Sequence, residues 1–240
     1  MIEGVSPNLP HTDHLPPTKE WGLRLVRVPV GLFLRTWWRV SVHGAENVPH
    51  SGPVILAANH IGLLDGPALV AVTRRLTFAM AKNELFRGFG GRMLTYVGQI
   101  PVARREPDLR AIDLAVQVLR SGRVLAVFPE GRRTDGRVSY ARGGAAYLAM
   151  VSGAPIVPVA ILGTREPGQA RGGFPQRGHP VHVVYGEPFL VASSPVPVPW
   201  PRRRQAVAEW TEHLRVRLAQ HVVAAQALTG LPLPGPPKPG

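Results

Sequence analysis

The chain has 240 residues, of which 45% are hydrophobic and 18% are charged, a balance that can bury a core and that excludes both a disordered chain and a collagen-like repeat. Cysteine is absent, which excludes a disulfide scaffold, a thiol nucleophile and a cysteine-ligated zinc site. The 28 lysines and arginines outnumber the 15 acidic residues, for a formal net charge of +13. Such a surface favours polyanions: nucleic acid, an anionic membrane face or phosphorylated small molecules.

The first 40 residues divide into two parts. Residues 1–18 are polar and proline-rich; we expect a disordered leader there, and they lack the basic start and apolar run of a secretory signal. Residues 19–40 carry tryptophan, leucine and phenylalanine between arginines, the composition of an amphipathic helical segment that lies in the headgroup zone of a membrane. Four arginines exclude a bilayer-spanning helix here, and Pro29 should kink one helix or separate two. The alternative for residues 19–40 is an N-terminal helix that packs on the rest of the domain.

Strand-like and helix-like patterns alternate in the following residues, 41–190. Short, continuously apolar runs are typical of strands buried on both faces of a sheet. We expect strands over residues 53–58, 76–81, 99–102, 123–128, 156–162 and 181–185. Helical patterns begin at about residue 66 and cover residues 107–119, 144–151 and 202–228. The alternation predicts an α/β fold with a largely parallel central sheet flanked by helices, in one domain over residues 19–228. The proline-rich tail, residues 229–240, is expected to be disordered.

A histidine and an aspartate follow the first apolar strand. In open α/β sheets, ligands bind beyond the carboxyl ends of the strands, and Asn59, His60 and Asp65 come directly after residues 53–58. A carboxylate that accepts a hydrogen bond from one imidazole nitrogen leaves the other nitrogen as a base for an alcohol proton. The chain has no G-x-S-x-G elbow and no cysteine, so the nucleophile would be a hydroxyl of the substrate. The alternative is that Asp65 only caps the next helix and that His60 is an ordinary loop histidine.

Two further polar clusters follow strands. Residues 128–134, Phe-Pro-Glu-Gly-Arg-Arg-Thr, bring together a carboxylate (Glu130), a flexible glycine and two guanidinium groups. Such a group can hold a phosphomonoester and the hydroxyls of a small polyol, because arginine binds phosphate through two parallel hydrogen bonds. The alternative is an ordinary polar turn with an internal Glu–Arg pair. Arg104 and Arg105 likewise follow a predicted strand.

In this order, the blocks resemble those of the glycerolipid acyltransferase family, whose best-known members are the 1-acylglycerol-3-phosphate (lysophosphatidate) acyltransferases. The resemblance covers about residues 35–190. The family's blocks are matched as follows: N-H-x-x-x-x-D by Asn59, His60 and Asp65; an arginine after a short apolar strand, most simply by Arg104; F-P-E-G-x-R-[ST] by residues 128–134; V-P-V-x-x-x-G-T by residues 157–164; and K-x-E-L-F by residues 82–86. Gly62 departs from the family, which often has serine there, and Arg132 stands where many members have threonine.

The resemblance implies an O-acyltransferase that moves a fatty acyl group from acyl-CoA or acyl-carrier protein to the free hydroxyl of a lysophospholipid, most simply 1-acylglycerol-3-phosphate, to give phosphatidate. Other acceptors that it leaves open are glycerol-3-phosphate, lysophosphatidylglycerol, a lyso-ornithine lipid and a glycolipid. It makes His60 the general base and Asp65 its orienting partner, with no metal and no bound cofactor. The substrate-binding residues that it implies are Arg104 and Arg133 for the acceptor phosphate, Glu130 and Gly131 for the glycerol, and Lys82 and Thr134.

The charge pattern adds expectations about partners. A lysophospholipid resides in a membrane, so an enzyme without a span needs a docking surface, and residues 19–40 and the net charge of +13 supply one. We therefore expect peripheral attachment to the cytoplasmic face of an anionic membrane and, because no nucleic-acid-binding motif is present, no nucleic-acid partner. Three arginines after Thr164 could bind CoA phosphates or lipid headgroups, or could belong to a solvated basic loop; they are Arg165, Arg171 and Arg177. The alternative function is a non-catalytic basic module that binds anionic lipid.

Overall fold

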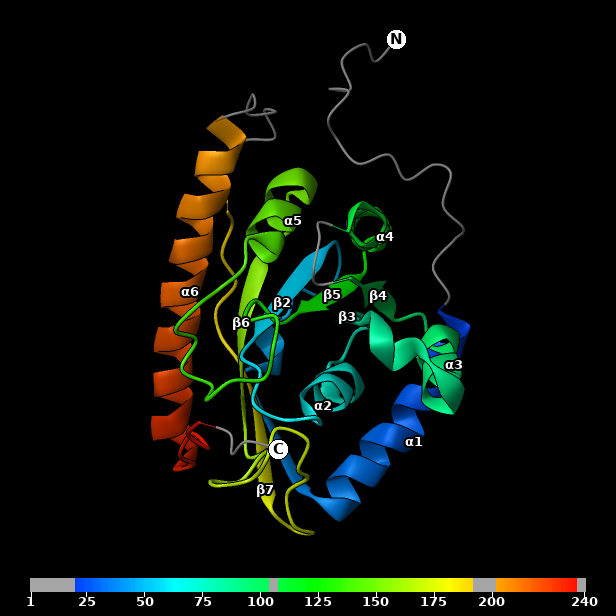
Figure 1. The fold of residues 1–240 in the computed structure, drawn as a ribbon, viewed down its shortest axis with the longest axis vertical. Helices are drawn as coiled ribbons and strands as arrows, with labels where there is room; N and C mark the ends of the chain where they lie inside the picture. Colours follow the sequence, from blue (N-terminus) through cyan, green and yellow to red (C-terminus); the bar gives the residue numbers. More distant parts are fainter. Residues whose placement is uncertain (1–19, 104–107, 192–201, 237–240) are drawn as a thin grey trace.

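One sheet of seven strands forms the centre of the computed structural model, which describes residues 20–103, 108–191 and 202–236 (Figure 1). The strands are β1 (Arg39–His43), β2 (Val54–Ala58), β3 (Thr77–Lys82), β4 (Ile100–Val102), β5 (Val124–Val127), β6 (Ile156–Leu162) and β7 (Pro180–Tyr185). Their order is β1-β7-β6-β2-β5-β3-β4, and every neighbouring pair is parallel except β6 and β7. The predicted α/β fold with a largely parallel sheet is therefore confirmed, although β1 has no counterpart among the expected strands.

Helices cover both faces of this sheet (Figure 1). They are α1 (Trp21–Trp37), α2 (Asp65–Val72), α3 (Gly88–Tyr96), α4 (Leu109–Arg120), α5 (Gly144–Ser152) and α6 (Arg202–Thr229), with 3-10 turns η1 (Ala45–Asn47) and η2 (Asn83–Phe86). α4 and α5 pack around Leu125 on one face of the central strands, and α2 packs on the opposite face through Leu69 and Val72. α6 lies along β6 and buries Leu218 and Val222, which its four-residue spacing places on one side of the helix.

The three central strands place their following loops next to one another. β2, β5 and β6 are buried along their whole length, as expected for parallel strands covered on both faces. β2 pairs in parallel with both β5 and β6, so the carboxyl ends of all three strands lie at one edge of the sheet. Residues 59–65, 128–134 and 163–165 therefore meet there. Arg104 follows β4, two strands beyond β5, and lies outside the described residues.

α1 is one continuous helix with Pro29 inside it. Its inner side packs on α2, where Leu34 and Trp38 share a buried cluster with Leu64 and Ala68. No helix in the described part of the chain is long and apolar enough to cross a membrane. The predicted leader, residues 1–18, lies outside the described residues.

The expectation of disorder after α6 is wrong for residues 230–236. Leu231 and Leu233 pack on the cluster between α6 and β6, and the carbonyl of Gly235 accepts a hydrogen bond from Arg165. Apolar side chains between the prolines supply contacts that a composition-based prediction does not count. The segment after α6 therefore returns to the edge of the sheet where the three loops meet.

Candidate active site

His60 and Asp65 form a hydrogen-bonded pair at the carboxyl edge of the sheet. Nδ1 of His60 lies 2.7 Å from Oδ2 of Asp65. The Asp65 side chain is fully buried, whereas 15% of the His60 side chain is exposed. Because a carboxylate only accepts hydrogen bonds, the imidazole proton lies on Nδ1 and Nε2 keeps its lone pair. This is the arrangement that a histidine general base requires.

The Asp65 carboxylate also organises the loop that carries His60. Oδ2 accepts hydrogen bonds from the backbone N–H groups of Ile61 at 2.7 Å and Gly62 at 2.9 Å, and Oδ1 accepts one from the hydroxyl of Thr164. Asp65 is the first residue of α2, but Leu64 is its N-cap, with no side-chain cap. The carboxylate therefore acts on the loop before the helix, and the alternative in which it only caps α2 does not describe it.

Gly62 leaves the space that the contact with Thr164 needs. A Cβ atom at this position would lie 2.5 Å from the backbone oxygen of Thr164, closer than carbon and oxygen atoms approach. The serine that the resembled family often has here would therefore require this loop to shift.

Asn59 ends β2 by replacing a backbone pair with its side chain. Its Nδ2 donates to the carbonyl of Ile161 at 3.0 Å, and its Oδ1 accepts from the N–H of the same residue at 2.7 Å. The side chain thus continues the pairing with β6 while the main chain turns away toward His60. The family pattern pointed to Asn59, but no role for it followed from the sequence.

Glu130 connects the 128–134 turn to the histidine. Its Oε1 accepts a hydrogen bond from the backbone N–H of His60 at 2.9 Å, and its Oε2 accepts one from the hydroxyl of Thr134. The N–H of Thr134 donates to the carbonyl of His60 at 2.8 Å, and the Phe128 ring stacks on the imidazole with centroids 4.4 Å apart. Burial raises the pKa of Glu130 above its ordinary value, against the opposing hydrogen bonds from Thr134 and His60. These contacts hold the backbone of His60 and one face of its ring, and they add to the bond between Nδ1 and Asp65.

Two other predicted residues lie on the same turn. Gly131 has φ +66°, a backbone conformation that favours glycine. A Cβ there would lie 2.8 Å from Nε of Arg142, so a larger residue would also displace that side chain. Nη1 of Arg133 donates to the carbonyl of Arg171 at 2.6 Å. The remaining N–H groups of the Arg133 guanidinium give this turn donors for an anion.

Lys82 lies apart from this group. Lys82 ends β3, which β5 separates from β2, and its Nζ lies 3.1 Å from Oε1 of Glu84. Arg104 lies outside the described residues. The structure therefore brings together His60, Asp65, Glu130, Gly131, Arg133 and Thr134.

The three arginines after Thr164 differ in their surroundings. Arg165 is only 1% exposed, so it neither belongs to a solvated loop nor faces CoA phosphates, and both expectations for it are wrong. Arg171 is exposed, and the guanidinium of Arg177 lies 4.8 Å from the centre of the Trp37 ring. Sequence reasoning gave no role to the hydroxyl of Thr164, which ends a mostly apolar family block.

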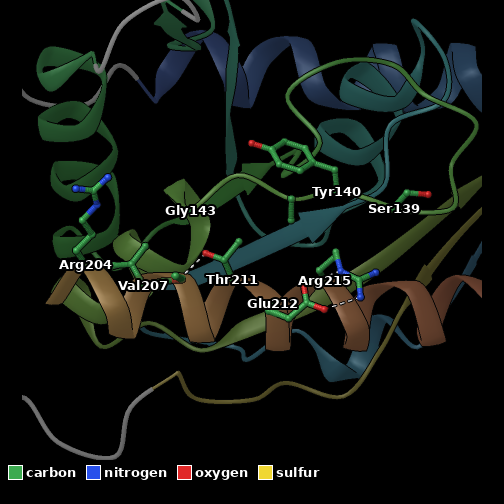
Figure 2. Close-up of a pocket in the computed structure, with 10 residues that line it drawn as sticks. Ser139, Tyr140, Gly143, Arg204, Val207, Thr211, Glu212 and Arg215 are labelled. Atoms are coloured by element: carbon green, nitrogen blue, oxygen red, sulfur yellow. Dashed lines mark hydrogen bonds and ion pairs between the residues drawn. The ribbon is translucent and has the colours of Figure 1, made fainter. Parts of the chain in front are cut away.

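A groove of about 460 Å³ lies between residues 139–143 and the N-terminal half of α6 (Figure 2). Its volume is within the range of ligand pockets. The lining combines the apolar Val207, the ring of Tyr140 and the guanidinium of Arg204. The N–H of Arg142 donates to the carbonyl of Pro129 at 2.8 Å, so one wall of the groove is bonded to the 128–134 turn. The two walls are far apart in the chain, and the sequence did not indicate the groove.

Comparisons with known proteins bear on the family of this chain. A family model described as "Acyltransferase" matches residues 39–162. A 1-acyl-sn-glycerol-3-phosphate acyltransferase of Bacillus subtilis is 33% identical over 126 residues, which are 52% of this chain and 63% of that protein. One of Borreliella burgdorferi is 34% identical over 133 residues, which are 53% of each chain. The matches thus span less than two thirds of the length of these curated relatives.

The fold also has a solved counterpart. The crystal structure of the 1-acyl-sn-glycerophosphate acyltransferase PlsC from Thermotoga maritima matches with a TM-score of 0.62 and 24% sequence identity, over 85% of this chain and 80% of that one. At this identity the match supports the fold. The residues matched by the family model cover more than half of the chain and contain both the His60–Asp65 pair and the 128–134 turn. On these grounds the chain belongs to the acyltransferase family.

Proposed function

We propose that the protein transfers a fatty acyl group from a thioester donor to the free hydroxyl of a lysophospholipid, with 1-acylglycerol-3-phosphate as the favoured acceptor and phosphatidate as the product. The observation that carries this proposal is the 2.7 Å bond between Nδ1 of His60 and the buried Asp65. It leaves Nε2 as a base at the edge of the sheet, beside an arginine-bearing turn.

The reaction needs one base and correct positioning. Nε2 of His60 takes the proton of the acceptor hydroxyl while the hydroxyl oxygen attacks the thioester carbonyl carbon. The C–S bond then breaks, and the imidazolium returns the proton to the departing sulfur, which gives an ester and a free thiol. Asp65 stabilises the imidazolium between these steps. Because a thioester carbonyl is already activated, we propose that no metal or bound cofactor takes part.

Arg133 is the proposed ligand of the acceptor phosphate. It lies three residues after Glu130, whose carboxylate holds the backbone of His60, so a phosphate on this arginine would place the glycerol near the base. Only one N–H of its guanidinium is used by the carbonyl of Arg171. Arg104 remains a second proposed ligand from the sequence pattern.

The groove beside the turn is the proposed site of the nucleotide part of acyl-CoA. Arg204 offers a cation for a phosphate, and the Tyr140 ring offers a face on which a base can stack. The hydrogen bond between Arg142 and Pro129 links this groove to the turn that holds His60. A donor carried by acyl-carrier protein has no nucleotide and would not use the groove.

The outer side of α1 supports attachment to a membrane. Large apolar side chains that are more than half exposed gather on α1 and the neighbouring α3, and we call them the membrane face: Trp21, Leu25, Val28, Leu32, Phe33 and Phe89. The rings of Trp21 and Tyr96 pack with centroids 4.6 Å apart and join the two helices. Exposed apolar patches of this kind mark interaction sites, and arginines along α1 complement anionic lipid. We propose peripheral attachment at the cytoplasmic leaflet through this face.

An assay of acyl transfer separates an enzyme from a non-catalytic lipid-binding module. Radiolabelled acyl-CoA is offered with a panel of lysophospholipids to the wild type, to His60→Ala and to the matched control His50→Ala, whose histidine is exposed outside the site. His60→Ala should lower turnover by roughly 100-fold or more and leave vesicle binding unchanged, while the control keeps wild-type turnover. A folded His60→Ala protein with wild-type turnover would refute the role of the base. A wild type that binds vesicles but acylates no acceptor would support the lipid-binding module.

A further inference from the structure

Arg165 is a buried cation that forms no ion pair with any carboxylate of the described residues. Its guanidinium donates to backbone carbonyls instead: Nη2 to Thr134 at 2.7 Å and to Gly235 at 2.8 Å, and Nη1 to Gln169 at 3.2 Å. Its Nε is buried without a partner. Burial lowers the pKa of this guanidinium, although an arginine remains protonated. Removing a cation from water is unfavourable. The burial of Arg165 against three carbonyl groups therefore suggests that these contacts have a role.

The carbonyl of Thr134 is the contact closest to the chemistry. The N–H of Thr134 bonds to the carbonyl of His60, and its hydroxyl bonds to Glu130, which in turn holds the N–H of His60. Arg165 therefore donates a hydrogen bond to Thr134, the residue that joins the 128–134 turn to the His60 loop. Its neighbour Thr164 bonds to Asp65. Thr164 and Arg165 are consecutive residues after β6, and they thus bond to Asp65 and to Thr134, the two residues that hold the His60 loop.

The third carbonyl comes from the C-terminal segment, residues 230–236. Leu233 of this segment lies against Gly136, where an added Cβ would approach its Cδ2 to 2.8 Å, and Leu231 lies against Gly163, where an added Cβ would approach its Cδ1 to 3.2 Å. Gly136 follows the 128–134 turn and Gly163 follows β6, so the segment contacts both of the loops that bond to the His60–Asp65 pair. Its prolines restrict the unfolded chain and reduce the entropy lost on ordering.

We propose that Arg165 is a positioning residue that fixes the 128–134 turn against the His60 loop, and that residues 230–236 are its outer support and thus part of the active site. The inference rests on the proposed acyl transfer. It assigns Arg165 no contact with either substrate, since its side chain is buried beneath the loops.

Four variants test the proposal by steady-state kinetics. Arg165→Met removes the donors while keeping length, and a chain ending at Thr229 removes the outer support. Their matched controls are Arg110→Met, an exposed arginine on α4, and a chain ending at Pro236, which keeps every contact described above. We expect the first two to lower kcat on the order of 10- to 100-fold, because small displacements of a catalytic group have effects of this size. The controls should keep wild-type kcat, and the KM for acyl-CoA should stay within about twofold.

Two readouts distinguish positioning from a purely structural role. Arg165→Lys retains the charge and part of the donor set, so it should recover part of the lost kcat. The effects of Arg165→Met and of ending the chain at Thr229 should combine to less than their product, because both remove one shared contact. Wild-type kcat in folded Arg165→Met, or a full product of the two losses, would overturn the proposal. Where Arg165→Met does not fold, the chain ending at Thr229 decides alone.

Hydrogen exchange gives a test that does not depend on activity. In the chain ending at Thr229, the amide of Thr134, which bonds to His60, and the amide of Gly136, which bonds to the Thr134 hydroxyl, should exchange faster than in the wild type. The amides of β5 should be unchanged. Unchanged exchange at both residues overturns the positioning proposal even when acyl transfer is observed. A wild type without acyl transfer overturns the proposed function and leaves this result standing.

Discussion

Asp65→Asn removes the charge of the dyad while keeping its shape. The asparagine oxygen can take the place of Oδ2, which accepts from Nδ1 of His60 and from the N–H groups of Ile61 and Gly62. The new amide nitrogen then faces the hydroxyl of Thr164, which can accept where it now donates. The loop therefore keeps its hydrogen bonds, and only the negative charge beside the imidazolium is lost.

The size of the effect follows from what the imidazolium loses. A hydrogen bond to a charged group contributes roughly 1.5–3 kcal/mol, against about 0.5–1.5 kcal/mol for a neutral one. The Coulomb attraction across 2.7 Å to a fully buried carboxylate is lost as well. We expect a barrier about 2–4 kcal/mol higher, which lowers kcat roughly 30- to 1,000-fold. Asp65→Ala, by contrast, leaves the buried N–H groups of Ile61 and Gly62 without an acceptor. Each unsatisfied donor costs about 1–3 kcal/mol, so this variant should lower the free energy of unfolding by about 2–6 kcal/mol.

Steady-state acyl transfer and thermal unfolding, measured on the same preparations, separate these outcomes. Asp65→Asn should lose kcat with little change in KM or unfolding temperature, and Asp65→Ala should lose both kcat and stability. Asp113→Asn, on α4 away from the site, is the matched control. A folded Asp65→Asn protein with kcat within threefold of the wild type would show that the loop needs the shape of this side chain but not its charge.

Four other changes test the remaining parts of the proposal. Arg133→Ala should raise the acceptor KM by roughly 10- to 100-fold, the size of a lost charged hydrogen bond, with the donor KM unchanged; the opposite pattern would assign this arginine to the donor. Leu25→Glu combined with Leu32→Glu should weaken co-sedimentation with anionic vesicles and spare turnover of a water-soluble short-chain acceptor, and equal sedimentation would exclude the membrane face. Burial raises the pKa of Glu130 above its ordinary 4.5, so the folded state binds this proton more tightly than the unfolded state. The free energy of unfolding of the wild type should therefore fall as pH rises from about 4.5 through the raised pKa. In urea unfolding, Glu130→Gln should lose less stability over that range, and the same pH dependence for both proteins would contradict this. Arg204→Glu should raise the KM for acyl-CoA but not the KM for the acylated carrier protein. An equal rise for both donors would contradict the proposal that the groove binds the nucleotide.

Parts of the site that are contiguous in the chain could be predicted from the sequence. His60 and Asp65 are five residues apart after an apolar strand, and the 128–134 turn follows another. Parallel pairing of β2 with β5 then brings these two loops together, because loops after neighbouring parallel strands share one edge. The His60–Asp65 pair and its contact with the 128–134 turn could therefore be predicted from the sequence alone.

Contacts between distant segments could not be predicted in the same way. Thr164 bonds to Asp65 across 99 residues. The family block that ends at Thr164 is otherwise apolar, and it did not indicate that this hydroxyl faces Asp65. Arg165 seemed solvated because arginines are seldom buried, and three carbonyls from separate segments compensate its burial. The segment at residues 230–236 seemed disordered because proline-rich composition usually is, whereas Leu231 and Leu233 find an apolar surface that only the folded domain provides.

The packing of α1 connects the proposed membrane face to the chemistry. Leu34 and Trp38 share a buried cluster with Leu64, the residue directly before Asp65. With α1 in the headgroup zone as proposed, this packing holds the dyad at a constant height above the lipid, since close-packed helices shift little relative to each other. A lysophospholipid could then present its hydroxyl to His60 while its acyl chain stays in the bilayer. The packed-helix interpretation of residues 19–40 thus describes the inner side of α1, and the proposed membrane segment concerns the exposed outer side of the same helix.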